Sequence, residues 1–295
     1  MSALFLRWLL LGCFPVLLGV VHAGEFEDSF RKEVGAFLDT LSEEQQENCM
    51  LKVEDKERWK MVYPGGKRPG VRIGDLNDTQ RAAFEKAMRL VLSDYGWQMA
   101  NKVALQDGKQ GLGKYWLTCF GDPRKEDDFA FRVAEHHLTI VHLEVVEGET
   151  KEFGPILLGS DPPELWKECE MDLIELWKTL DNPKALIKDR KGVASAAMSE
   201  GDGIAYAELN DEAKKKLKAV WERRLSIFTP SIKERIKKLH QAKGGWEQCR
   251  VAYYNEEPEK RCIDGGRWDF KCGMPGFLWD LETSRTHIHM SLWTK

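Results

Sequence analysis

The sequence lacks the short motifs that mark several common enzyme classes. It contains no Gly-x-Ser-x-Gly nucleophile elbow, no Walker phosphate loop, no His-Glu-x-x-His zinc motif and no Gly-x-Gly-x-x-Gly loop after a strand. These absences argue against the corresponding hydrolases, nucleotide-binding proteins and zinc proteases. We therefore expect no nucleotide cofactor.

The sequence also lacks a strong excess of positive charge. The 295 residues carry a formal net charge of -4, so the chain has no general basic field and we expect no nucleic acid partner. A chain of this length can bury a sizeable core within one domain.

Long apolar runs are confined to the first residues. Residues 8–21 are almost wholly apolar, Arg7 is the only basic residue before them, and a small-residue cleavage site precedes Gly24. This pattern predicts a signal peptide over residues 1–23, which would leave an exported, periplasmic or extracellular chain with no stable membrane span. The alternatives are a lipid on Cys13, which follows a lipobox-like Leu-Leu-Gly, and an uncleaved anchor.

No two cysteines have the Cys-x-x-Cys spacing of a cysteine zinc site. Six cysteines follow the predicted signal peptide, and this number is compatible with disulfides, with buried thiols or with a mixture of both. If one pair is bonded, Cys249 and Cys262 are the best candidates, because they flank a turn that contains proline.

Hydrophobic periodicity predicts helices grouped with helices and strands grouped with strands. The expected helices cover residues 26–41, 77–92, 165–180, 210–228 and 231–240, and the expected strands cover residues 114–120, 129–146, 153–158, 251–254, 267–272, 277–281 and 286–295. Residues 63–70 and 189–202 are expected to be loops, and His240 is expected to be exposed. The grouping predicts an α+β fold in which an antiparallel sheet is partly covered by helices, as a single domain over residues 24–295.

The possible halves of this domain, 24–163 and 164–295, repeat one order of features. Each half has a helix after Leu-Asn-Asp, at residues 76–78 and 209–211, and later an aromatic-rich segment, at residues 129–131 and 277–279, followed by a histidine pair. A duplicated unit explains this order, and chance recurrence of common elements explains it equally well. In a duplicated protein, a pseudo-twofold axis would relate the two histidine strands, which could meet at it.

Five of the six histidines after the predicted signal peptide fall in two short apolar segments. His287 and His289 are two residues apart in the closing strand, so their side chains share one face. His136 and His137 are adjacent in a predicted strand, so only one of them is expected to face the same site, and His142 is expected to lie outside it. Three histidines and a water molecule would suit zinc or copper.

Nearby charged residues supply candidate catalytic groups. Glu135, Asp280 and Glu282 could provide a fourth ligand or a general base, and Arg132 could hold an anionic substrate group through two hydrogen bonds. The leading hypothesis is a metal-dependent hydrolase or oxidase that acts on a small-molecule or extracellular substrate. The alternatives are a non-catalytic extracellular ligand-binding protein and a purely structural histidine network in the core.

Several of these motifs resemble the domain of unknown function 3500 (DUF3500) family, which is found mainly in exported bacterial proteins. The matching residues are Arg68-Pro69-Gly70, Gly74-Asp75-Leu76, Arg132, His136-His137-Leu138, Leu158-Gly159, Pro162, Ala207, Leu209, Asp280, Glu282, His287-Ile288-His289 and Trp293. The resemblance covers nearly all of the chain after the predicted signal peptide. It implies that the paired histidines belong to one site, and it implies no particular substrate. The chain departs from the family pattern at Glu135, at Thr283 and after Trp293.

Overall fold

The computed structural model describes residues 23–61, 67–126, 128–144, 153–188, 198 and 201–294. The predicted signal peptide up to residue 22, the first part of the predicted loop at 63–70 and most of the predicted loop at 189–202 lie outside the described residues. No helix in the described part of the chain is long and apolar enough to cross a membrane.

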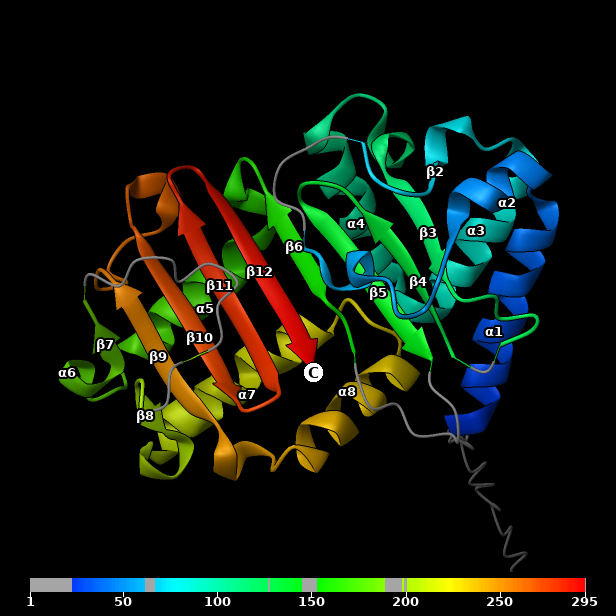
Figure 1. The fold of residues 1–295 in the computed structure, drawn as a ribbon. Coiled ribbons are helices and arrows are strands. Elements are labelled where there is room, and N and C mark those ends of the chain that lie inside the picture. The colour runs from blue at the N-terminus through cyan, green and yellow to red at the C-terminus, as the bar shows by residue number, and fades with distance from the viewer. Residues whose placement is uncertain are drawn as a thin grey trace, which may run out of the picture.

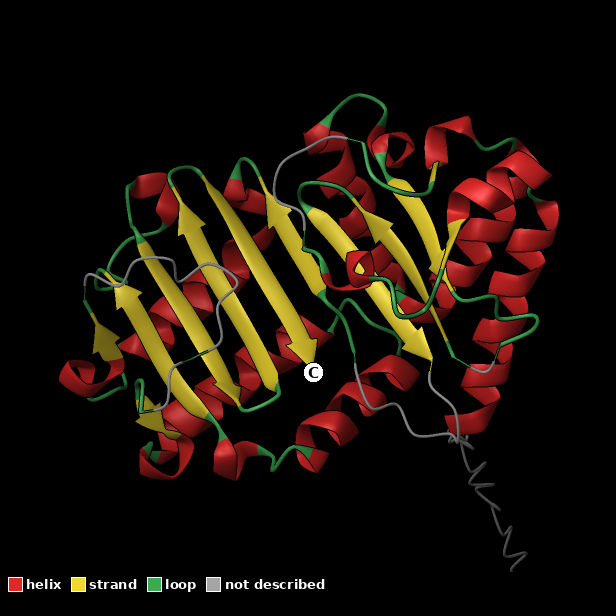
Figure 2. Ribbon diagram, in the orientation of Figure 1, coloured by secondary structure: helices red, strands yellow, loops and turns green. Residues whose placement is uncertain are grey.

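One open, mostly antiparallel sheet runs through the molecule, and the helices lie mainly on one of its faces (Figures 1 and 2). The sheet has 12 strands in the order β1-β3-β4-β5-β6-β12-β11-β10-β9-β7, while β2 pairs with β3 and β8 pairs with β9. The predicted α+β class is therefore confirmed.

The elements follow each other in the same order in the two halves of the chain. The first half consists of α1 (Ala23–Thr40), α2 (Glu43–Cys49), β1 (Met50–Leu51), β2 (Val71–Arg72), α3 (Asp78–Val91), α4 (Asp94–Asp107), β3 (Trp116–Phe120), β4 (Phe129–Ala134), β5 (Leu138–Glu144) and β6 (Ile156–Ser160). The second half consists of α5 (Lys167–Trp177), α6 (Asn182–Ala185), β7 (Leu186–Ile187), β8 (Ile204–Ala205), α7 (Asp211–Leu225), α8 (Pro230–Ala242), β9 (Arg250–Asn255), β10 (Trp268–Met274), β11 (Phe277–Ser284) and β12 (His287–Thr294).

Equivalent strands also have equivalent neighbours. β1 pairs parallel and β2 antiparallel with β3, and β7 and β8 pair with β9 in the same two senses. The successions β3-β4-β5-β6 and β9-β10-β11-β12 are both antiparallel, and β6 pairs with β12 where the halves meet. A pseudo-twofold axis therefore relates the two halves of the sheet.

The strand register gives the position of this axis. Residues with the same pairing in both halves are Trp116 and Arg250, Ala134 and Gly273, Thr139 and Leu278, Leu157 and Trp293, and Ile156 and Leu292. Ile156 and Leu292 also pair with each other, so the axis passes between them.

The repeat does not relate the histidine segments to each other as the sequence suggested. The hairpin β4-β5 corresponds to β10-β11, so the counterparts of His136 and His137 are Pro275 and Gly276. The aromatic segment at 129–131 likewise corresponds to residues 268–270 and not to 277–279. The correspondence between the two halves that the sequence suggested was wrong at these positions, because it matched residue types without knowledge of the strand register.

The two faces of the sheet differ in chemistry. Successive side chains of a strand point to opposite faces of the sheet. Apolar side chains dominate one face, and most of the polar side chains lie on the other. The helix-covered face presents Leu117, Phe131, Ile140, Leu158, Met290, Leu281, Phe270 and Tyr253, whereas the opposite face presents Thr118, Arg132, Thr139, Ser291, Asp280 and Lys271. The candidate site described below belongs to the polar face.

Three local predictions differ from the structure. The predicted strand at 129–146 is a hairpin whose turn, at residues 135–137, contains neither glycine nor proline to announce it. Helix α4 was not predicted because Gly96 lies in its first turn, yet a Cβ on Gly96 would lie 1.9 Å from the carbonyl oxygen of Ile227. His240 is buried, not exposed, because its ring packs against Trp246.

The six described cysteines are buried free thiols. The suggested Cys249–Cys262 pair is not bonded: Cys249 directly precedes β9, whereas Cys262 lies in the connection that follows the other end of this strand. Cys249 instead lies 3.4 Å from Nε2 of His240.

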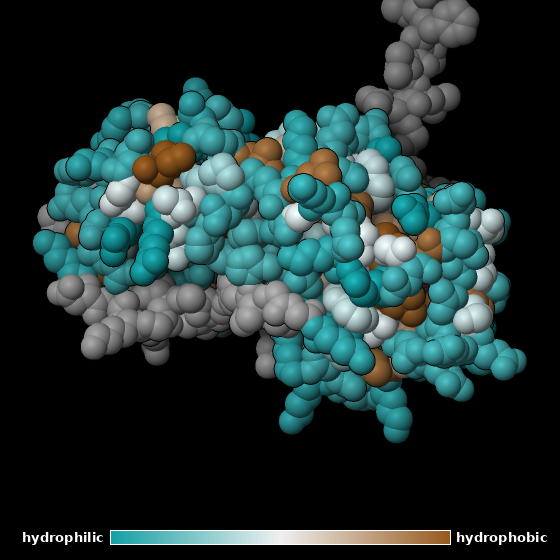
Figure 3. Space-filling model, turned by 90° about the horizontal axis from the view of Figure 1, so that it is seen from above, coloured by the Kyte–Doolittle hydropathy of each residue, from teal (hydrophilic) through white to brown (hydrophobic). Residues whose placement is uncertain are grey.

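Figure 3 views the end of the sheet that is uppermost in Figure 1. The coloured surface in this view is mainly hydrophilic, with small hydrophobic patches that are separate from one another. Among the described residues, the large apolar side chains that are exposed are Tyr95, Leu105, Met171 and Ile263.

Candidate metal centre

Strand β6 brings the two histidine segments together at one end of the sheet. Gly159 of β6 pairs with His289 of β12 on one side, and on the other side its N–H donates to the carbonyl of His137 at 2.7 Å. The side chains of His137 and His289 therefore stand on the same polar face on either side of a glycine. One nitrogen each from His136, His137 and His289 lies within 4.8 Å of the others.

Gly159 leaves the space that these imidazoles occupy. A Cβ at this position would lie 2.7 Å from Cδ2 of His137, 2.8 Å from Cδ2 of His289 and 2.9 Å from the carbonyl oxygen of Ile288. Any larger residue would therefore push the two rings apart. The site depends on this glycine because of its missing side chain.

All four predicted ligand histidines belong to one cluster. The ring centroids of His136, His137, His287 and His289 are 4.1 to 6.3 Å apart. The prediction that only one of His136 and His137 faces the site was wrong, because both belong to the β4-β5 turn, where strand alternation does not apply. His142 lies further along β5, and its side chain is outside the described residues.

Asp107, the last residue of α4, orients His137. Its carboxylate bonds to Nδ1 of His137 with one oxygen and accepts the hydroxyl of Tyr115 with the other. Burial opposes ionisation, but the hydrogen bonds from His137 and Tyr115 outweigh it and hold the pKa of Asp107 below its usual value. Because a carboxylate only accepts, Nδ1 of His137 carries the proton and Nε2 keeps its lone pair.

A second ion pair supports this part of the site. The guanidinium of Arg68 lies 2.9 Å from the carboxylate of Glu135, and both side chains are buried. Burial lowers the pKa of Arg68, while the charge of Glu135 acts against this decrease. Arg68 therefore anchors Glu135, which directly precedes His136 in the chain.

The imidazoles of His136, His287 and His289 are held in their neutral forms. Burial, followed by the adjacent imidazoles, lowers the pKa of His289 to about 3. Burial and the neighbouring His137 lower the pKa of both His136 and His287 as well. Neutral imidazoles have a free lone pair, which is the form that binds metal ions.

Two ring nitrogens in the cluster have no hydrogen-bond partner among the described residues. They are Nδ1 of His136 and Nε2 of His137, and both are shielded from solvent. A buried polar atom without a partner is costly, so such atoms call for an explanation. A metal ion is the group that fits a set of converging, neutral imidazole nitrogens.

The predicted catalytic residues occupy different positions. Glu282 of β11 pairs with His289 and so shares its face of the sheet, which places a buried carboxylate beside the cluster. Asp280, two residues earlier, accepts hydrogen bonds from the backbone N–H and hydroxyl of Ser291 at 2.6 and 2.7 Å. These bonds give Asp280 a structural role in joining β11 to β12.

Arg132 also has structural partners. Its guanidinium donates to the carbonyl of Glu57 and, at 3.3 Å, to the hydroxyl of Thr118. Burial lowers its pKa to about 10. These bonds tie the segment between β1 and β2 to the polar face, where Figure 1 shows it crossing β4 and β5.

Asp107 and Tyr115 were not found from the sequence as site residues. One signal was available, since a carboxylate in the last turn of a helix opposes the helix dipole and is unfavourable unless a cation or donor faces it. It went unused because the helix itself was not predicted. Arg68 was noted only as part of the resemblance.

The fit of Gly159 between two rings yields a testable prediction. Gly159→Ala should lower the free energy of unfolding by about 1–3 kcal/mol, because the new methyl group overpacks a site bounded partly by backbone. Urea unfolding of the variant and the parent protein would measure the difference. Gly35→Ala is the matched control, since its Cβ would meet only the flexible side chain of Arg124. Equal stability of Gly159→Ala and the parent would show that the rings are not held as described.

Comparison with family models matches residues 24–291 to the family described as protein of unknown function (DUF3500). Comparisons with curated proteins and with solved structures find no match. The family match includes the β4-β5 turn, the β6 glycine and the His-x-His strand that form the cluster. The chain therefore belongs to the DUF3500 family.

Proposed function

We propose that the histidine cluster binds a transition-metal ion, zinc or copper, and that the protein is a metal-dependent hydrolase or oxidase. The observation that carries this proposal is the convergence of nitrogens from His136, His137 and His289 within 4.8 Å. His287 lies next to this triad, with its ring centroid 4.9 Å from that of His289. The donor set is therefore all imidazole, which suits zinc and copper better than magnesium or calcium.

The residues around the triad support metal binding. Asp107 fixes the tautomer of His137, which is the usual role of a carboxylate behind a metal-binding histidine. Burial keeps the imidazoles neutral, so metal would not have to displace protons from them near neutral pH.

A bound ion of this kind supplies Lewis acidity and lowers the pKa of a coordinated water molecule. In the protein itself, Glu282 is the carboxylate best placed to accept a proton from a group held at the imidazoles, because it lies directly across from His289. Asp107 and Tyr115 hold His137 still during such a transfer. The substrate is a small molecule or an extracellular compound that reaches the polar face of the sheet.

We also propose that the protein is exported. The apolar stretch at residues 8–21 and the small-residue cleavage site before Gly24 support this assignment.

Metal analysis tests the centre directly. Purified protein, exposed to zinc and to copper in separate samples and then desalted, should hold nearly stoichiometric metal by mass spectrometry. The His287→Ala, His289→Ala double variant should hold none, because it removes the β12 imidazoles. Met290→Leu controls for the folding of β12, since Met290 faces the helices. Absence of metal from the parent after both exposures would rule out the metalloenzyme.

The role of Glu282 distinguishes an enzyme from a binding protein. Glu282→Gln should keep the metal but lower turnover by about 10²–10⁴-fold, as expected when a general base is removed. Turnover would be measured on a panel of chromogenic carboxylic and phosphate esters and by oxygen uptake with phenolic substrates. Asp280→Asn is the matched control, because Ser291 already holds that carboxylate and its loss should affect stability more than turnover. Unchanged turnover in Glu282→Gln would exclude Glu282 as the base, and a parent without turnover would favour a binding protein.

Export is tested separately. When the full-length gene is expressed in a bacterium, the protein should be recovered outside the cytoplasm with Gly24 at its N-terminus by intact mass. A cytoplasmic protein that retains residues 1–23 would contradict export, and a lipid adduct on Cys13 would identify a lipoprotein.

A further inference from the structure

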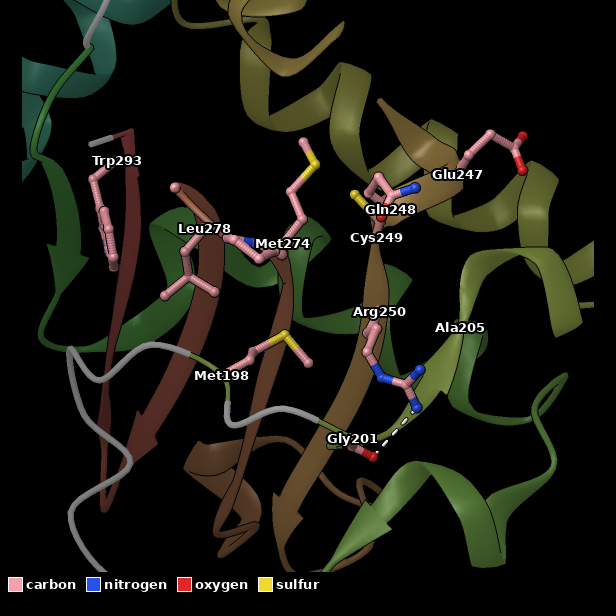
Figure 4. A pocket seen from close by; sticks show the side chains of 13 residues that line it. Met198, Gly201, Ala205, Glu247, Gln248, Cys249, Arg250, Met274, Leu278 and Trp293 are labelled. Atoms are coloured by element: carbon pink, nitrogen blue, oxygen red, sulfur yellow. Dashed lines mark hydrogen bonds between the residues drawn. The ribbon is translucent and has the colours of Figure 1, made fainter. Parts of the chain in front are cut away.

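The second half of the protein contains a cavity of about 550 Å³ on the polar face of the sheet. Figure 4 shows Trp293 and Leu278 along one side of it and Arg250 along the other, with Met198 between them. Met274 and Cys249 also contribute to its lining. The volume is in the range of cavities that take a small organic ligand.

The cavity adjoins the pseudo-twofold counterpart of the turn that carries two of the clustered histidines. The β10-β11 turn that lines it, with Pro275 and Gly276, is equivalent to the β4-β5 turn that carries His136 and His137. By the same register, Met274 takes the place of Glu135. The cavity and the histidine cluster are therefore built on equivalent turns of the two halves.

The side chains at equivalent positions of the two halves differ in chemistry. The imidazoles and the carboxylate of the first half are replaced by proline, glycine and a thioether, and Leu278 replaces Thr139. Cys249, which directly precedes β9, stands where Tyr115 precedes β3 and binds Asp107. Among its described lining residues, the cavity therefore has no histidine that could bind a metal ion.

Arg250, the basic residue of the cavity lining, already has hydrogen-bond partners in the protein. The guanidinium of Arg250 donates to the carbonyls of Asp202 at 2.8 Å, Gly203 at 2.6 Å and Gly201 at 3.3 Å. These bonds hold the start of β8 against β9. Glu247 is the acidic residue of the lining, and it is exposed at the rim.

We propose that this cavity is a second binding site, for an uncharged, mainly apolar small molecule with an aromatic or fused-ring face. Trp293 offers a flat surface for stacking, and Leu278 adds apolar area beside it. Met198 and Met274 are flexible and polarisable, so they can adapt to the outline of such a ligand. The site binds without metal and without chemistry, and it does not rest on the function proposed for the histidine cluster.

The neutral fluorophore N-phenyl-1-naphthylamine is a suitable probe, because its emission rises when it enters an apolar site. Titration into the purified protein should give saturable binding to one site. Probe in the cavity should also quench the fluorescence of Trp293. A Trp293→Phe variant should lack this part of the decrease in intrinsic emission.

Two variants test the site by replacing a lining residue with the residue at the equivalent position of the first half. Met274→Glu introduces the counterpart residue Glu135, and Ala205→Arg introduces the counterpart residue Arg72, which would project into the cavity. Each should weaken probe binding at least about tenfold, because it places a charge on an apolar wall. Thr139→Leu is the control, since it places the counterpart residue of Leu278 in the first half and leaves the cavity lining unchanged.

Circular dichroism and urea unfolding show whether each variant is folded. The expected result is loss of probe binding in Met274→Glu and Ala205→Arg with stability unchanged, while Thr139→Leu still binds the probe. Probe binding that persists in both folded variants would overturn the proposal, as would a parent protein that does not bind the probe. Binding that is lost instead in the His287→Ala, His289→Ala variant would place the ligand at the histidine cluster and also overturn it. If the variants do not fold, Trp293→Phe with unchanged probe binding and an unchanged decrease in intrinsic emission would overturn it independently.

Discussion

The pairing of β6 with β5 on one side and β12 on the other is the constraint on which the candidate site depends. It places His137, from the β4-β5 turn of the first half, and His289, from the last strand of the second half, on either side of Gly159 in a single row across the sheet. Backbone hydrogen bonds hold this geometry, so the imidazoles are brought together by the most rigid part of the fold. The helix-borne carboxylate of Asp107 then adds orientation from outside the sheet.

The repeat supplies the frame but not the site. Both halves present the same strands and turns in the same register, but the β4-β5 turn carries histidines whereas the equivalent β10-β11 turn carries Pro275 and Gly276. The remaining two histidines come from β12, which belongs to the second half. A symmetric scaffold thus carries an asymmetric site. The cavity beside the β10-β11 turn is the site for which we propose a ligand of a different kind.

The sequence predicted the fold class and the grouping of the histidines, because apolar periodicity and the His-x-His alternation are local properties. It did not predict the β4-β5 turn, since His136 and His137 are not turn-forming residues, and that error led to the wrong conclusion that only one of them could face the site. It also missed α4 and with it Asp107, because the reason for Gly96 is a contact with Ile227 that is remote in sequence. Partnerships such as Asp280 with Ser291 follow from strand register, which local patterns do not specify.

The glycine between the two rings also bears on folding fidelity. A slip of β12 by one residue would turn Ile288 and Met290 to the polar face and drive both histidines into the helix-covered core. The same slip would remove His289 from its position opposite Gly159 and so break up the imidazole cluster. The site therefore penalises misregistered chains, and in this way the cluster helps to select the native pairing of the two halves during folding.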